Sequence, residues 1–136
     1  MEIAIILIVL NLCHFLADYT HLSNSWMLNA KRLGSPLFPI FCHALVHGLL
    51  MALCLEVFFS VTIDGYSPFE FRATTTDYLF LLQVSSHFFI DVWKGKMNKW
   101  FPLLQSPSNK WHWVVFGADQ FFHQLIIIIM AICATS

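Results

Sequence analysis

The chain has 136 residues, of which 58% are hydrophobic and only 11% are charged, and its formal net charge is −1. A soluble globular domain typically carries about 25% charged residues, so this composition indicates an integral membrane protein with lipids as its surroundings. The length suits one domain over residues 1–136, and the chain has no basic patch interleaved with aromatic residues, so no nucleic-acid partner is expected.

Four apolar segments follow one another along the chain, at residues 2–20, 37–60, 77–95 and 113–134. Each is long enough, at about 1.5 Å per residue, to cross a hydrocarbon core of about 30 Å as a helix. The polar stretches between them contain the Gly, Pro and Ser residues that favour turns. We therefore expect an all-α fold, a transmembrane four-helix bundle. The first segment lacks the basic start and cleavage site of a signal peptide, and we interpret it as the first span.

The basic residues predict how the bundle is oriented. Six of the seven Lys and Arg residues fall in the first and third connections, and only Arg72 falls in the second. Because basic residues accumulate on the cytoplasmic side, these two connections are expected there and both termini outside the cytoplasm. Tryptophans anchor helices at membrane interfaces. Five of them cluster toward the same side: Trp26, Trp93, Trp100, Trp111 and Trp113.

Each apolar segment contains one pair of histidine or aspartate residues four positions apart. The pairs occur in "HFLAD", "HALVH", "HFFID" and "DQFFH", and their similar order in the two halves of the chain predicts two repeated helical hairpins. Residues at i and i+4 lie on one helix face, about 6 Å apart along the axis. The eight residues are His14, Asp18, His43, His47, His87, Asp91, Asp119 and His123.

Alternating helix directions sort these residues by depth within the cytoplasmic half of the membrane. The deeper layer is expected to contain His14, His47, His87 and His123. The shallower layer is expected to contain Asp18, His43, Asp91 and Asp119. An aspartate at the bilayer centre costs about 2.5–3.5 kcal/mol on insertion scales, so three of them need compensation. Facing helices build dinuclear metal sites from such donors. The pattern therefore predicts a site for transition metal ions (Zn, Fe or Mn), two in number, with some of the eight side chains orienting the ligands.

Two alternatives to a metal site are open at this point. Each pair could form a buried His–Asp hydrogen bond without metal, although four pairs at matched depth favour one shared site. Two histidines on facing helices could also ligate a haem, but three aspartates at that level would crowd the porphyrin edge. Lys94, one turn beyond Asp91, could meet an anionic substrate, but a lysine that extends its ammonium to the membrane surface is the expected interpretation.

These motifs resemble those of an uncharacterised family of small four-span bacterial inner-membrane proteins, a domain of unknown function. Its pattern is HxxxD in the first span, a tryptophan and basic residues next, HxxxH in the second span, HxxxD with a trailing lysine in the third, and DQxxH in the fourth. Here these positions are His14/Asp18, Trp26 with Lys31 and Arg32, His43/His47, His87/Asp91 with Lys94, and Asp119–Gln120/His123. The resemblance covers nearly the whole chain and implies a bacterial inner-membrane location, but no activity.

Three functions fit these residues. The first is a metal-dependent hydrolase of a lipid or phosphate ester, with Asp91 and Asp119 as catalytic residues, because a metal pair can generate hydroxide and clamp a phosphoryl oxygen. The second is a di-iron membrane oxidase or hydroxylase, although the sequence lacks the HxxHH clusters usual in such enzymes. The third is a non-enzymatic metal-binding or transport module, or a subunit of a homo-oligomer or larger membrane complex.

Overall fold

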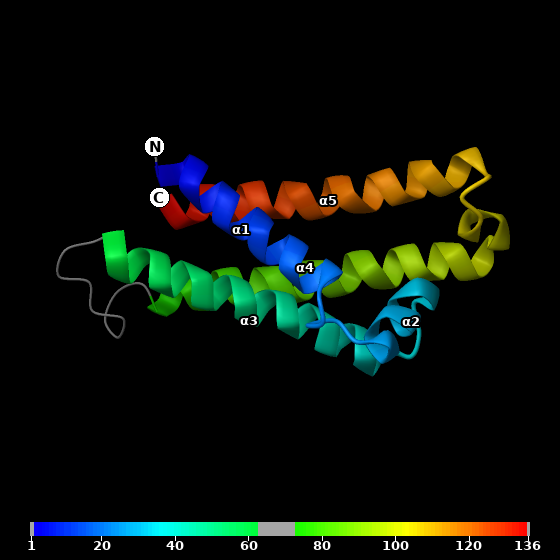
Figure 1. Cartoon of the computed structure of the whole chain (residues 1–136), viewed down its shortest axis with the longest axis horizontal. Coiled ribbons are helices and arrows are strands. Elements are labelled where there is room, and N and C mark those ends of the chain that lie inside the picture. Colours follow the sequence, from blue (N-terminus) through cyan, green and yellow to red (C-terminus); the bar gives the residue numbers. More distant parts are fainter. Residues whose placement is uncertain (1, 63–72, 136) are drawn as a thin grey trace.

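The computed structural model describes residues 2–62 and 73–135, and the regular structure in these ranges is entirely helical. A short helix, α2 (Ser25–Leu33), and a 3-10 helix, η1 (Pro102–Gln105), lie at the end of the bundle opposite both termini. Four long helices run alternately in opposite directions (Figure 1): α1 (Glu2–Tyr19), α3 (Leu37–Thr62), α4 (Ala73–Trp100) and α5 (Lys110–Thr135). The prediction of an all-α fold is confirmed.

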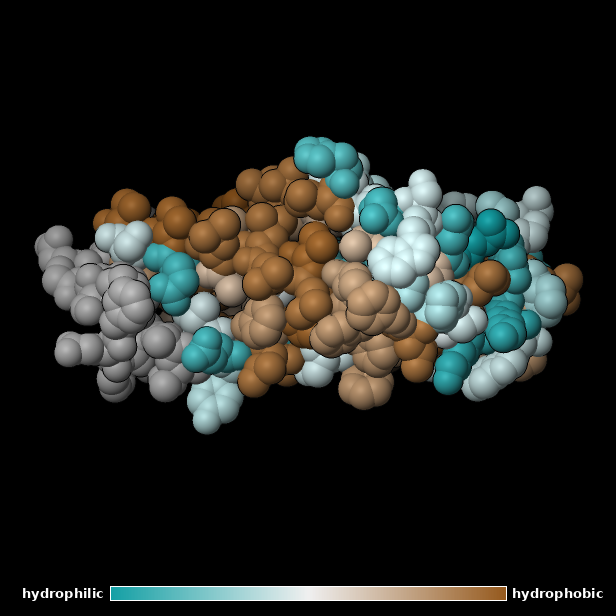
Figure 2. All heavy atoms as spheres, turned by 90° about the horizontal axis from the view of Figure 1, so that it is seen from below, coloured by the Kyte–Doolittle hydropathy of each residue, from teal (hydrophilic) through white to brown (hydrophobic). Residues whose placement is uncertain are grey.

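Three of the long helices are long and apolar enough to cross a membrane: α1, α3 over Leu37–Val61, and α5. Within the described part of the chain α4 does not reach this apolarity, because polar residues such as Gln83 and Ser86 accompany its His–Asp pair. Three of the four predicted spans are therefore compatible with crossing a membrane, and the four-span bundle stays a prediction. Figure 2 shows an apolar surface over the middle of the molecule and a polar end around α2 and η1.

Helix α2 was not predicted, since its residues were assigned to a polar connection. The side chain of Asn24 accepts a hydrogen bond from the backbone N–H of Met27 and so caps the first turn. Gly34 ends the helix in the left-handed conformation, with φ of 65°, which glycine adopts without strain. Most of the predicted second connection, including Arg72, lies outside the described residues.

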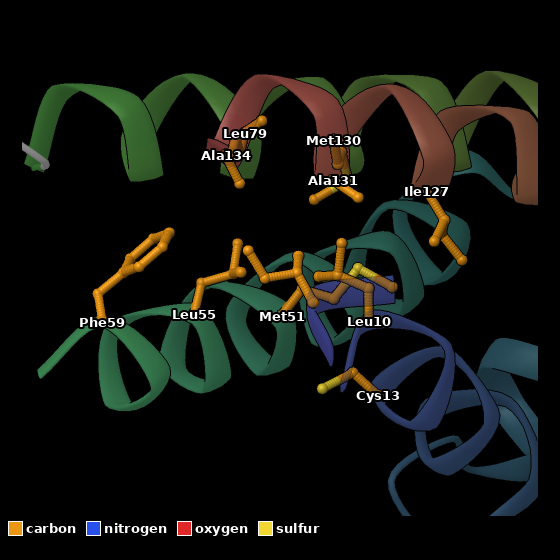
Figure 3. Close-up of a cluster of buried hydrophobic side chains, with 11 residues drawn as sticks. Leu10, Cys13, Met51, Leu55, Phe59, Leu79, Ile127, Met130, Ala131 and Ala134 are labelled. Atoms are coloured by element: carbon orange, nitrogen blue, oxygen red, sulfur yellow. The ribbon is translucent and has the colours of Figure 1, made fainter. Parts of the chain in front are cut away.

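The half of the bundle toward the termini is filled by apolar side chains from all four long helices, which we call the apolar cluster (Figure 3). Its small members allow the helices to approach closely, as is typical of helix packing in membranes. Gly48 serves the same purpose between α3 and α4, where an added methyl group would meet Val84 and lie 3.1 Å from Phe80. The cluster contains Ile6, Leu10, Cys13, Met51, Leu55, Phe59, Leu79, Ile127, Met130, Ala131 and Ala134.

Candidate metal centre

The eight predicted histidine and aspartate residues meet inside the other half of the bundle. Each long helix contributes one pair, and every member except Asp18 is classed as buried, with Asp18 keeping 10% of its side chain exposed. The ring centroids of His47 and His87 are 3.7 Å apart, and those of His87 and His123 are 4.3 Å apart. We call this set the nest: His14, Asp18, His43, His47, His87, Asp91, Asp119 and His123.

Two groups within the nest have the spacing of metal ligands. One donor atom from each of Asp18, His43, His47 and His87 lies within 4.8 Å of the others, and the same holds for His87, Asp91 and His123. His87 belongs to both groups, yet a neutral imidazole has one lone-pair nitrogen and ligates one ion at a time. Imidazole and carboxylate together suit Zn, Fe and Mn.

The hydrogen bonds around His43 fix its tautomer. Ser23 donates its hydroxyl proton to the carbonyl oxygen of Ala17 at 2.6 Å, because a carbonyl can only accept. The contact of 2.8 Å between Ser23 Oγ and His43 Nδ1 must then use the histidine as donor. Neutral His43 therefore carries its proton on Nδ1 and turns the lone pair of Nε2 toward the nest, 3.2 Å from Asp18 Oδ1 and 3.6 Å from Asp91 Oδ2. Coordination of a metal ion through Nε2 needs this tautomer.

His123 is fixed in the same way. Its Nδ1 lies 2.8 Å from the carbonyl oxygen of Asp119, so Nδ1 must donate and Nε2 keeps its lone pair. That Nε2 is buried without a hydrogen-bond partner and lies 3.9 Å from Asp91 Oδ1. Two of the five nest histidines thus present a lone pair to the interior through bonds made by the opposite ring nitrogen.

Several other buried polar atoms of the nest also lack hydrogen-bond partners. They include the Nε2 atoms of His47 and His87, both carboxylate oxygens of Asp91, and Oδ1 of Asp119. The amide nitrogen of Gln83 lies 3.5 Å from His87 Nδ1 and can only donate, so this contact places the proton of neutral His87 on Nε2. Asp91 does have an ion-pair partner, since Lys31 Nζ lies 3.4 Å from its Oδ1, but that contact lacks hydrogen-bond geometry. An unsatisfied buried polar group costs about 1–3 kcal/mol, and a charged one costs more. A cation among these atoms would satisfy several at once.

Two lysines close the polar end of the nest. Lys31, on α2, donates to Asp18 Oδ1 at 2.8 Å, and its Nζ lies 3.0 Å from His43 Nε2. Lys94, on α4, donates to Asp119 Oδ2 at 2.6 Å. Burial lowers the pKa of Lys31, but the carboxylates of Asp91 and Asp18 outweigh this effect, so its pKa stands above the ordinary value. Both ammoniums act as counter-charges to nest carboxylates.

A close contact between two glycines places Lys31 over the nest. A methyl group on Gly34 would lie 2.6 Å from the backbone nitrogen of Lys96 and 2.8 Å from the carbonyl oxygen of Val92. A methyl group on Gly95 would meet the backbone of Gly34 and lie 2.5 Å from the carbonyl oxygen of Lys31. Helix α2 therefore rests directly on the backbone of α4, which holds the Lys31 side chain at the mouth of the nest.

The structure brings all eight predicted residues together, six of them at ligand spacing. His14 and Asp119 stand beside the two groups: the His14 ring lies 4.9 Å from that of His47, and Asp119 Oδ1 lies 3.6 Å from His123 Nδ1. The interpretation of Lys94 as a lysine extended to the membrane surface was wrong, because its ammonium binds Asp119. Sequence reasoning also missed Ser23 and the contacts of Lys31, which depend on how the first connection folds back.

The fold and the nest define an all-helical protein with membrane-compatible helices and a histidine–aspartate cluster close enough to bind a metal ion. The chain belongs to the DUF3307 family of proteins of unknown function, which matches residues 6–136. No curated protein and no solved structure matches the chain. The resemblance to an uncharacterised domain family is therefore confirmed, while the four-span and bacterial parts of that expectation stay predictions.

Proposed function

We propose that this protein is a four-span membrane protein that binds one or two transition metal ions in the nest. The face of α4 turned inward carries its polar residues, with Gln83, His87 and Asp91 buried. The face turned outward carries exposed apolar residues, with Tyr78 and Phe89 more than 60% exposed. A helix with polar residues inside and apolar residues outside suits lipid, which supports α4 as the fourth span despite its modest apolarity.

We place the nest toward the cytoplasmic face of a bacterial inner membrane, with both termini on the opposite side. The basic residues Lys31, Arg32 and Lys94 gather at the end with α2, and the termini lie at the other end. Cysteine labelling of intact cells tests this orientation in a background without the four native cysteines, because Cys133 is exposed. Cysteines placed beside Lys31 should be shielded, and cysteines placed near residue 65 should react. The reverse pattern would contradict the orientation.

The observation that supports the metal assignment most strongly is the convergence of buried polar atoms without hydrogen-bond partners, among them both oxygens of Asp91 and Nε2 of His123. One ion would take Asp18, His43 and His47, with His87 as a fourth donor once its proton moves to Nδ1 and the Gln83 amide oxygen accepts from it. A second ion would then have only Asp91 and His123 from the other group. Its additional donor would be Asp119, whose Oδ1 is buried and without a hydrogen bond.

The activity we propose is metal-dependent hydrolysis of a phosphate ester, including a lipid-linked one. A divalent metal ion supplies the Lewis acidity for such a reaction. Asp91 and Asp119 are its candidate catalytic carboxylates. Asp91 would orient a water molecule, because both of its oxygens face the nest without hydrogen-bond donors. The apolar cluster fills the half toward the termini, so the described residues give no support to an ion path through a single chain.

Elemental analysis of the protein purified in detergent tests this proposal. We expect one or two equivalents of Zn, Fe or Mn per chain, lost on treatment with a chelator and regained on reloading. Iron with oxygen-dependent chemistry would favour the oxidase alternative over hydrolysis. A purified chain that contains no metal and takes up none on reloading would contradict the proposal.

A further inference from the structure

Lys31 and a metal ion in the first ligand group would compete for the same atoms. The Lys31 ammonium donates to Asp18 Oδ1, and it lies 3.0 Å from the Nε2 lone pair of His43. The tautomer set by Ser23 gives His43 a single lone pair, which serves either an ammonium or a metal ion. An ion that takes this nitrogen and Asp18 therefore removes two partners from Lys31 at once.

Binding of a metal ion would also reverse the sign of the net charge of the nest. With neutral histidines, the three carboxylates and the ammoniums of Lys31 and Lys94 leave one net negative charge. One divalent ion turns this into one net positive charge, and two ions give three. Uncompensated charge at a buried site is costly, so the loaded nest favours the binding of an anion.

Lys31 and Lys94 lie at the partly exposed mouth of the nest, where an anion could enter from solvent. Their side chains keep 13% and 19% of their surface exposed, whereas those of His43, Asp91 and Asp119 keep none. Lys31 cannot withdraw together with its helix, because Gly34 and Gly95 hold α2 against α4. An ammonium released from Asp18 thus stays at the mouth, beside the metal position.

We propose that the metal-loaded nest binds a phosphate dianion at its mouth, with the Lys31 and Lys94 ammoniums as donors to its oxygens. The inference rests on the proposed metal site and identifies the group that the site recognises. A phosphate dianion changes the net charge of the nest from +1 to −1 with one ion, or from +3 to +1 with two. It also accepts several charge-assisted hydrogen bonds, which a carboxylate does less well. The phosphate comes either from a lipid headgroup or from a free phosphate compound.

Calorimetry with inorganic phosphate, on purified protein whose metal content has been measured, tests this proposal. The metal-loaded wild type should bind phosphate, and the chelator-treated wild type should not, because Lys31 then returns to Asp18. Lys31→Met should keep or raise the metal content and weaken phosphate binding about tenfold, the effect expected for one charge-assisted hydrogen bond. The matched control is Lys99→Met, at an exposed position of the same polar end, and it should bind phosphate as the wild type does.

Competition separates the two sources of phosphate. Vesicles with phosphatidic acid should displace inorganic phosphate if the natural ligand is a headgroup, and vesicles of phosphatidylcholine alone should not. If neither displaces it, the ligand is a free phosphate compound. Equal phosphate affinity in loaded and stripped protein, or in Lys31→Met and Lys99→Met, would overturn the anion site and leave the metal site standing. A chain that binds no metal would overturn both.

Discussion

Toward the termini the four long helices meet through the apolar cluster, whereas toward α2 the same helices meet through the nest. Leu55 and Met130 are buried in the cluster with no polar atom to satisfy. His47 and Asp91 are equally buried in the nest, but their polar atoms lack hydrogen-bond partners. The cluster needs no ligand to stabilise the bundle, whereas the unpaired polar atoms of the nest are costly unless a cation binds among them, as we propose. We therefore expect changes in the cluster to affect mainly the stability of the fold, and changes in the nest to affect mainly metal binding.

The change with the largest expected effect is Asp91→Asn, which removes one charge of the nest at constant size. We expect the variant to retain at least one metal ion per chain but to lose hydrolytic turnover, because the water is no longer oriented and the charge no longer balanced. Turnover on a phosphate ester and metal content should be measured on the same preparation. Asp77→Asn makes the same change at an exposed position of α4 and should leave turnover intact. Unchanged turnover in Asp91→Asn would remove this residue from the mechanism.

The second change is the removal of histidines shared by the nest. His47→Ala and His87→Ala should each lower metal affinity by more than about tenfold, since each removes a direct donor. Both should also lower the thermal stability of the loaded protein, and their combined effect should be less than additive, because residues of one network couple. Gln124→Ala, beside His123 and only half-buried, is the control. Additive losses of stability at full metal content would indicate separate structural hydrogen bonds.

The third change tests the apolar cluster. Leu55→Ala leaves a cavity in the apolar cluster and should lower the free energy of unfolding by about 2–5 kcal/mol. Metal content per folded chain should stay at the wild-type value, because the nest does not include this residue. Leu53→Ala, at a position 62% exposed on the same helix, should change stability much less. Metal loss in Leu55→Ala would show that the two halves are not independent.

The smallest expected effect concerns the contact between α2 and α4. Gly95→Ala forces the backbones of Gly34 and Gly95 apart and should cost about 1–3 kcal/mol of stability, as overpacking does. It should also weaken phosphate binding, because Lys31 moves with α2. Gly117→Ala is a sharp control, since no atom lies within 4 Å of the added methyl group. Equal thermal unfolding of the two variants would contradict the close helix contact.

The apolar composition and length of the segments predicted the long helices well, and the differences have a clear cause. Predicted segment 2–20 became Glu2–Tyr19, but predicted segment 77–95 became Ala73–Trp100. Hydropathy reports the length buried in lipid, and a helix can continue beyond it through residues such as Lys96 and Asn98. Helix α2 could have been predicted, because Asn24 and Gly34 are its ordinary start and stop signals.

The i,i+4 pairs predicted the nest because spacing along a helix fixes which face a residue occupies. The same reasoning could not find Ser23 and Lys31, whose contacts with His43 depend on the path of a connection and on the tight approach of Gly34 to α4. Lys94 shows a further limit. It lies three positions from Asp91 in sequence, yet it binds Asp119 on α5. Which of the two carboxylates it reaches depends on how α4 and α5 pack together.

Anomalous diffraction at the absorption edge of the metal, from crystals of the purified protein, tests the central claim most directly. We predict a peak inside the bundle, at about 2.0–2.3 Å from His43 Nε2 and an oxygen of Asp18, with the Lys31 ammonium displaced from both. A peak on the exposed surface, or a nest without a peak in which Asp91 bonds only to imidazole N–H groups, would contradict it.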